Sequence, residues 1–154
     1  MTLILAFALG MTTGLRSMAP AAVVARAAHL WWPAVRSTGL SFMASPLTAV
    51  VFTLFAAVEL VFDKLPFTPS RLEAVPLAAR ILLGALTGAT LCAAAQQSIA
   101  VGGVVGGVGG VAGAFAGHRV RRYLTTTKRL PDLPVALCED AIAILGAVAI
   151  AWRV

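Results

Sequence analysis

Long apolar runs, separated by short polar or charged connections, make up most of this chain of 154 residues. A helix that crosses the hydrocarbon core of a bilayer needs about 20 mostly apolar residues. Runs of this kind predict five membrane-spanning helices, at 3–25, 45–62, 70–95, 99–117 and 134–152. We therefore expect an all-α fold, a polytopic membrane helix bundle that forms one transmembrane domain over residues 1–154.

Local signals mark several of the expected helix starts. Ser45-Pro46 combines an N-cap residue with proline at the first helical position. Ser70-Arg71-Leu72-Glu73 has the pattern of a capping box. Met1-Thr2 offers no basic region of the kind that opens a cleaved signal, so we expect the first helix to remain in the mature protein.

Composition supports the membrane class. Hydrophobic residues make up 60% of the chain and charged residues 12%, whereas soluble domains are about 25% charged. A soluble domain of this size could not bury so much apolar surface. The net charge of +6 fits basic cytoplasmic loops better than nucleic-acid binding. Cys92 and Cys138 lack CxxC spacing and a nearby histidine, so we expect core residues and no metal site or cofactor.

The first apolar run contains Arg16, about 20 Å along a helix and hence at mid-bilayer if that helix spans. A charge at this depth normally faces a partner or water and marks a functional site. Pro20 lacks the N–H that would bond the Arg16 carbonyl, so the helix should break at Arg16-Ser17. Gly10 and Gly14 would allow another helix to approach just before the break.

Other charges lie within predicted spans. Arg80 shares a helix face with Gly84 and Gly88, so it should point into the bundle. Glu139 and Asp140 are submerged if the last helix spans, because too few residues follow them to cross alone. Glu59 lies deep in the second helix, whereas we expect Asp63 at the surface beside Lys64. We expect Arg16 and Arg80 to pair with Glu139, Asp140 and Glu59, because buried charges need partners.

Glycines recur every four residues in the fourth run, a spacing that lets helix backbones approach closely in lipid. Gly106 and Gly110 belong to one such series, and Gly113 and Gly117 to another, so this helix should contact neighbours on several sides. Two interpretations remain open: tight packing alone, or a flexible helix that lines a path. A dinucleotide-binding loop is rejected, because no acidic residue follows at the required distance.

Basic residues bias the expected topology. The connection after the fourth run is the most basic, and placing it in the cytoplasm puts the N-terminus inside and the C-terminus outside. Seven basic residues then lie inside, namely Lys64, Arg71, Arg119, Arg121, Arg122, Lys128 and Arg129. Arg26, Arg36 and Arg153 lie outside, which leaves open a re-entrant hairpin for the first segment, or dual topology.

A shared G-x-x-x-G-x-R pattern suggests an internal repeat. It occurs at Gly10–Arg16 and at Gly113–Arg119, each time before a basic connection. With the first and fourth helices antiparallel, this would be an inverted repeat like those of small transporters.

The stretches "GLRSMAP", "RILLGALTGA", "GVAGAFAGHRVRR" and "LPDLPVALCEDAIAI" resemble a family of small bacterial membrane proteins described as domain of unknown function four-one-two-six. The resemblance covers nearly the whole chain. It implies an all-helical, multi-pass domain in the bacterial cytoplasmic (inner) membrane, and it assigns no activity or ligand.

The residues themselves favour a small transporter or channel for an anionic solute. Its candidate binding residues are Arg16, Ser17, Arg80, Glu139, Asp140 and Glu59, and its candidate helix-packing residues are Gly10, Gly14, Pro20, Gly84, Gly88, Gly106, Gly110, Gly113 and Gly117. No catalytic pattern is present, so we expect no enzyme, and the small-residue faces favour a homo-oligomer. The alternatives are a structural or assembly protein without substrate, and a protein that binds anionic lipid.

Overall fold

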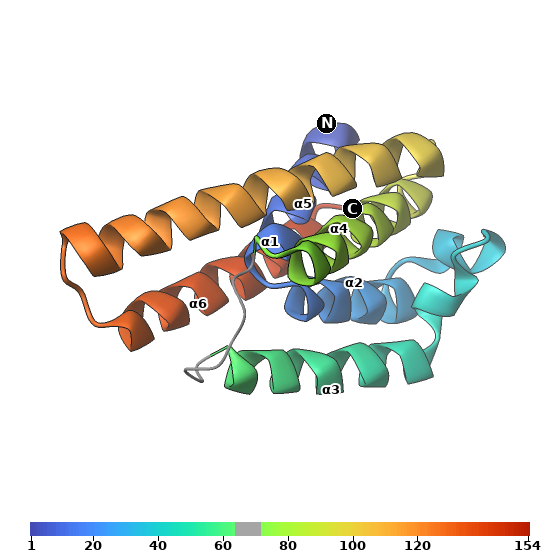
Figure 1. The fold of residues 1–154 in the computed structure, drawn as a ribbon. Coiled ribbons are helices and arrows are strands. Elements are labelled where there is room, and N and C mark those ends of the chain that lie inside the picture. The colour runs from blue at the N-terminus through green and yellow to red at the C-terminus, as the bar shows by residue number, and fades with distance from the viewer. Residues whose placement is uncertain (64–71) are drawn as a thin grey trace.

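The computed structural model describes residues 1–63 and 72–154, and within these residues it contains helices and no strands (Figure 1). The all-helical prediction is therefore confirmed. The elements in chain order are α1 (Thr2–Leu15), α2 (Met18–Leu30), η1 (Pro33–Ser37), η2 (Ser41–Ala44), α3 (Pro46–Phe62), α4 (Ala74–Ala94), α5 (Ile99–Arg122), η3 (Tyr123–Thr127, a π-helical turn) and α6 (Asp132–Ala151).

Polar caps fix two helix starts. The Ser45 hydroxyl accepts a hydrogen bond from Leu47 N at 3.3 Å, and Pro46 is the first residue of α3, as predicted. The Ser98 hydroxyl accepts one from Val101 N at 3.4 Å at the start of α5. The predicted capping box at 70–73 falls partly outside the described residues, and α4 begins at Ala74, directly after Glu73.

Among the described residues, three helices are long and apolar enough to cross a membrane: α4, α5 with η3 (Ile99–Thr127), and α6. The apolar helix α3 has 17 residues and extends about 26 Å, close to the thickness of the hydrocarbon core of about 30 Å. α1 and α2 have 14 and 13 residues and are too short to cross alone.

The bundle has the inverted surface of a membrane protein. Large apolar side chains face outward, such as Leu145 at 67% and Leu54 at 62% exposure. Arg16, Arg80, Glu139 and Asp140 are buried instead. A soluble protein rarely leaves such extensive apolar surface open to water, whereas a bilayer covers it. The protein is a helical membrane bundle.

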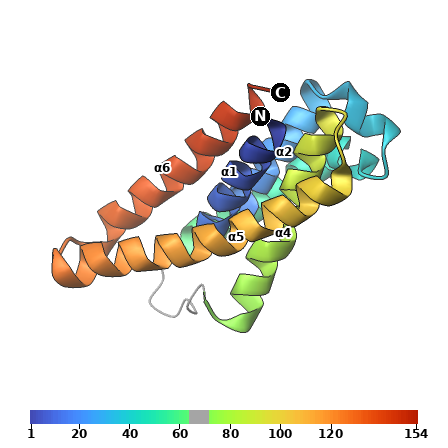
Figure 2. The same ribbon diagram turned by 90° about the horizontal axis from the view of Figure 1, so that it is seen from above.

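The chain reverses direction between α1 and α2. Arg16 of the α1–α2 junction lies against Asp140 of α6, while Trp31 at the end of α2 lies 5.6 Å from Trp152 at the end of α6, measured between ring centroids. Figure 2 shows both chain ends at one end of the bundle, which we call the terminal end. Of the two arrangements that the sequence left open, a spanning first helix and a hairpin, the structure has the hairpin.

α5 packs against both α1 and α4, and its direction corrects one expectation (Figure 2). A methyl group on Gly10 would meet the backbone of Gly106, and one on Gly14 would meet the backbone of Ala114. The contacts advance together along both helices, so α1 and α5 are parallel. The predicted antiparallel arrangement, and the inverted repeat built on it, is wrong because the reversal at Arg16 lets α1 start at the same end as α5.

Glycines hold these three helices close together on two faces of α5. Towards α4, a Cβ on Gly110 would lie 2.6 Å from the carbonyl oxygen of Arg80, and one on Gly84 would lie 2.7 Å from that of Gly106. A Cβ on Gly88 would likewise lie 2.9 Å from the Cα of Gly106. Towards α1, Gly113 faces the backbone of Met11. No side chain fits at these positions.

Candidate functional site at the broken helix

The hairpin tip is an interruption in the helical backbone. Leu15 ends α1, and Arg16 is extended, with φ −136° and ψ 117°. The N–H of Arg16 still bonds the carbonyl of Thr12 at 3.0 Å. Pro20 is the third residue of α2 and is buried, and it offers no N–H to the Arg16 carbonyl. The predicted break therefore lies at Arg16-Ser17.

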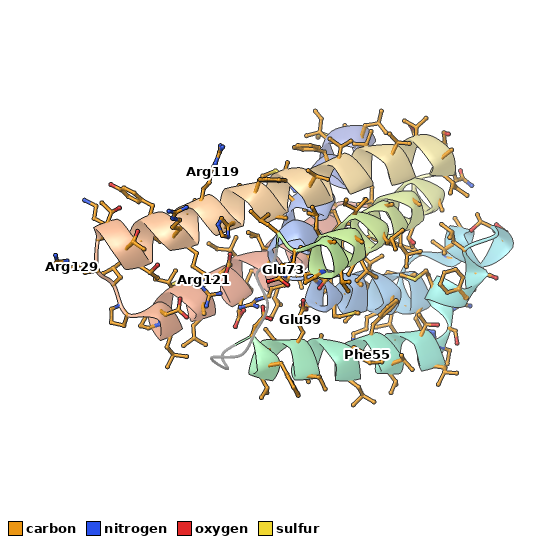
Figure 3. The ribbon with its side chains drawn as sticks, viewed as in Figure 1. Phe55, Glu59, Glu73, Arg119, Arg121 and Arg129 are labelled. Atoms are coloured by element: carbon orange, nitrogen blue, oxygen red, sulfur yellow. The ribbon has the colours of Figure 1, made fainter. Side chains whose placement is uncertain are left out.

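A carboxylate from α3 holds the start of α2. Glu59 accepts hydrogen bonds from Ser17 N and Met18 N, both at 2.8 Å, and from the Ser17 hydroxyl. The first N–H groups of a helix have no partner within the helix, and the helix dipole favours an anion there. Glu59 meets both requirements from a different helix (Figure 3).

A guanidinium from α4 holds the end of α1. Arg80 donates from Nε to the Gly14 carbonyl at 3.1 Å and from Nη1 to the Pro76 carbonyl at 3.0 Å. Its side chain lies inside the bundle, and the residue is 5% exposed. The last carbonyls of a helix carry partial negative charge, so a cation is favourable at this position.

Arg16 lies between these two caps and is fully buried. Its Nε donates to Asp140 of α6, and its Nη1 forms an ion pair with Asp63 at the end of α3. Its Nη2 is also buried and has no hydrogen-bond partner among the described residues. A buried donor without an acceptor is rare and costly, so it marks a place where a further acceptor would be favourable.

A second ion-pair cluster lies nearby between α5 and α6. Arg121 donates to both carboxylate oxygens of Asp132, at 2.8 and 2.6 Å, and its Nη1 lies 3.8 Å from Glu139. Figure 3 shows Arg121 on the side of α5 that faces α6, with Arg119 on the opposite side.

The structure thus brings most of the predicted binding residues to the break. Three helices, α3, α4 and α6, and the α1–α2 junction bring together Arg16, Ser17, Glu59, Arg80 and Asp140. Glu59 accepts hydrogen bonds from backbone N–H groups and from the Ser17 hydroxyl, and Arg80 donates to backbone carbonyls. Glu139 lies against Arg121.

Two residues of these clusters were not predicted. Asp63 was expected at the surface, yet it pairs with Arg16, and its spacing of four from Glu59 was the signal that both share a helix face. Arg121 was assigned to the basic connection, although it follows Gly113 and Gly117 at spacings of four and so shares their buried face.

Other candidate residues have packing positions. Gly117 is buried and lines a cavity between α5 and α6, described below. In the part of the chain that the structure describes, no group of histidine, cysteine and acidic residues is placed to hold a metal ion.

The break holds a buried guanidinium between two carboxylates. The forked donors of Arg16 fit the oxygens of a carboxylate or phosphate. Low dielectric around the buried group strengthens such contacts.

Comparisons with curated proteins and with solved structures each gave no match. A family model does match, over residues 3–153, and it covers α1 to α6 as the four sequence stretches indicated. With the helical fold and nearly the whole length in agreement, the chain belongs to the family described as Domain of unknown function (DUF4126).

Proposed function

We propose that the protein is a small transporter of anionic solutes in the bacterial cytoplasmic membrane and that Arg16 binds the anion. The observation that carries the proposal is the buried Nη2 of Arg16, which has no acceptor among the described residues and lies at a backbone break inside the bundle. Broken helices with exposed backbone ends are the usual site of substrate binding in small transporters.

The energetics favour a role beyond packing. A buried ion pair adds little stability over apolar residues of the same size, because removing two charges from water offsets their attraction. An intramembrane arginine costs at least about 2.5 kcal/mol on insertion scales. Burying Arg16 with two carboxylates therefore costs more free energy than packing the helices with apolar side chains would. A role in ligand binding would explain why the charges are there.

Asp63 and Asp140 would have different roles in binding. Asp63 directly follows α3, and its side chain is 16% exposed. Asp140 lies within α6, and its side chain is 10% exposed. We propose that a solute carboxylate or phosphate enters beside Nη2 and takes the place of Asp63. Asp140 stays as the permanent counter-ion, and the Ser17 hydroxyl is within the same cluster.

Flux of anions into proteoliposomes tests the proposal, with inorganic phosphate, chloride and small mono- and dicarboxylates as probes. Arg16→Lys keeps the charge and loses the forked donors, so the KM of the transported anion should rise by about 10- to 100-fold, the worth of a charged hydrogen bond. Arg36→Ala is the matched control, since Arg36 is exposed at the terminal end and donates only to the His29 carbonyl. Equal flux in wild type and Arg16→Lys would overturn the proposal.

A structural clasp is the second candidate function, favoured by the caps that Glu59 and Arg80 provide. The triple variant Arg16→Met, Asp63→Leu, Asp140→Leu separates the two. Replacing a buried charge cluster by apolar residues is often neutral for stability. If the protein is a transporter, the triple variant should fold but carry no anion flux. If the cluster is only a clasp, the wild type itself should carry no anion flux, and the triple variant should either fold like the wild type or fail to fold.

A further inference from the structure

A cavity of about 500 Å³ lies between α5 and α6, and α1 forms a further wall. α5 and α6 spread apart from the turn that joins them, and α1 lies between them (Figures 1 and 2). The walls are nearly all apolar and include Met11 and Leu15 of α1, Val120 and Leu124 of α5 and η3, and Val135 and Ile142 of α6. We call this cavity the α5–α6 groove. Its volume falls within the usual range for ligand pockets, about 300–1,000 Å³.

The α5–α6 turn beside the groove is strongly basic, and its residues Leu130 and Pro131 line the groove. Arg122, Lys128 and Arg129 are exposed there, and we call this part of the molecule the basic end. Figure 3 shows Arg129 at this end. With Arg119 and Arg121, these three basic residues give five positive charges around this end, against the two negative charges of Asp132 and Glu139. The turn that flanks the groove at Leu130 and Pro131 therefore carries a surplus of positive charge.

The basic end also lies at the depth of lipid headgroups. From Ile99 at the terminal end to Arg119, α5 advances 20 residues, or about 30 Å, which is the thickness of the hydrocarbon core. Arg122, Lys128 and Arg129 follow at the interface. The part of the groove lined by Leu15, Ala116 and Ile142 then lies beside the acyl region of the same leaflet, and the part lined by Leu124 lies at headgroup level.

We propose that the α5–α6 groove binds one anionic phospholipid, with an acyl chain against Leu15 and Ile142 and the headgroup phosphate at Arg122, Lys128 and Arg129. Apolar walls next to a basic turn match the two parts of such a lipid. A second copy of the chain fits less well, because it would bring two basic ends together. The inference does not depend on Arg16 or on the proposed transport.

Native mass spectrometry of the full chain in detergent tests this proposal. The probes are dioleoyl phosphatidylglycerol, dioleoyl phosphatidylcholine with the same chains, and inorganic phosphate, which has the charge and no chain. We expect one phosphatidylglycerol bound per chain, weaker binding of phosphatidylcholine and none of phosphate. Equal binding of the two lipids, or binding of phosphate alone, would overturn the proposal.

Two sets of variants locate the lipid. The triple variant Arg122→Ala, Lys128→Ala, Arg129→Ala should weaken phosphatidylglycerol binding by about 100-fold, on the order of fivefold per basic residue. The matched control removes three basic residues from the terminal end: Arg26→Ala, Arg36→Ala, Arg153→Ala. An equal loss in both triple variants would contradict the proposed site.

Filling the groove tests the acyl chain separately. The variant Ala116→Trp places a large side chain in the groove, because Ala116 is exposed and lines it. The control is Val104→Trp, since Val104 is exposed on another part of α5. Only Ala116→Trp should lose dioleoyl phosphatidylglycerol. If Ala116→Trp fails to fold, the wild type is tested instead with the short-chain lipid dihexanoyl phosphatidylglycerol, which should bind weakly. Unchanged lipid binding in Ala116→Trp, equal binding of the short-chain lipid, or dimers that disappear in Ala116→Trp would reject the lipid as occupant.

Discussion

The side chain of Arg16 is fully buried, and its two carboxylate partners come from helices that are distant in the sequence. Removing one member of such a group leaves the others charged and desolvated in a medium of low dielectric. The cost of a single substitution is therefore much larger than the net contribution of the whole group to stability.

A double-mutant cycle on Arg16 and Asp140 should show this coupling. Arg16→Met should lower the free energy of unfolding by about 3–5 kcal/mol, because it removes the cation that Asp63 and Asp140 share. Asp140→Asn should cost far less when Arg16 is already Met. Equilibrium unfolding in mixed micelles measures both effects, and additive costs would show that the pair is not coupled.

Neighbouring glycines of α5 should respond oppositely to alanine. A Cβ on Gly106 would meet the backbone of Gly84 and Gly88, so Gly106→Ala should destabilise by about 1–3 kcal/mol. Gly107→Ala is the control: its Cβ would have only ordinary contacts, the nearest at 3.6 Å, and should stabilise by up to about 1 kcal/mol. Thermal unfolding distinguishes them, and equal shifts would argue against close packing of α4 on α5.

At the scale of elements, the α1–α2 hairpin depends on helices that are not part of it. Its free backbone groups are bound by Glu59 of α3 and Arg80 of α4, each at the helix end whose partial charge it complements. Interrupted backbone is tolerated at membrane depth only where its polar groups find such partners.

Substitution of Glu59 should loosen the start of α2 specifically. Glu59→Ala removes the acceptor of Ser17 N and Met18 N and should destabilise by about 1–2 kcal/mol, as the loss of a helix cap does. Hydrogen exchange should speed up at these two amides and stay unchanged in α4. Glu59→Gln, which keeps one carbonyl oxygen, should show a smaller effect; an equal or larger one would contradict the capping role.

At the scale of the whole molecule, the hairpin places both chain ends at the terminal end (Figure 2). The sequence predicted the N-terminus on the cytoplasmic side, whereas the hairpin places it on the same side as the C-terminus. This change does not alter which end of the bundle carries the basic residues. Arg119, Arg122, Lys128 and Arg129 still lie towards the basic end, and Arg26, Arg36 and Arg153 towards the terminal end. The basic end is therefore the one expected in the cytoplasm.

Labelling with a membrane-impermeant maleimide tests this orientation. In a background with Cys92 and Cys138 replaced by alanine, Thr2→Cys and Arg153→Cys should both react from outside intact spheroplasts. Lys128→Cys should react only after the membrane is opened. Labelling of Thr2→Cys together with Lys128→Cys would instead support a spanning first helix.

The sequence predicted where helices begin and break better than it predicted which charged residues pair. The helix start at Ser45-Pro46 and the break at Arg16 depend on neighbouring residues, so they could be predicted. Spacing alone does not determine the ion pair of Arg16 with Asp63, because Asp63 lies at the end of its helix, where a surface position is equally compatible with the sequence. The same holds for Arg121, which lies among other basic residues.

By itself, the sequence determined the membrane class, the apolar runs and the position of the break, because hydrophobicity and the missing N–H of Pro20 are local properties. Only the tertiary structure decided that the chain reverses at Arg16 and which acid meets which arginine. A broken helix can continue or turn back, and the choice depends on partners such as Asp140, 124 positions away, which are brought near only when the helices pack.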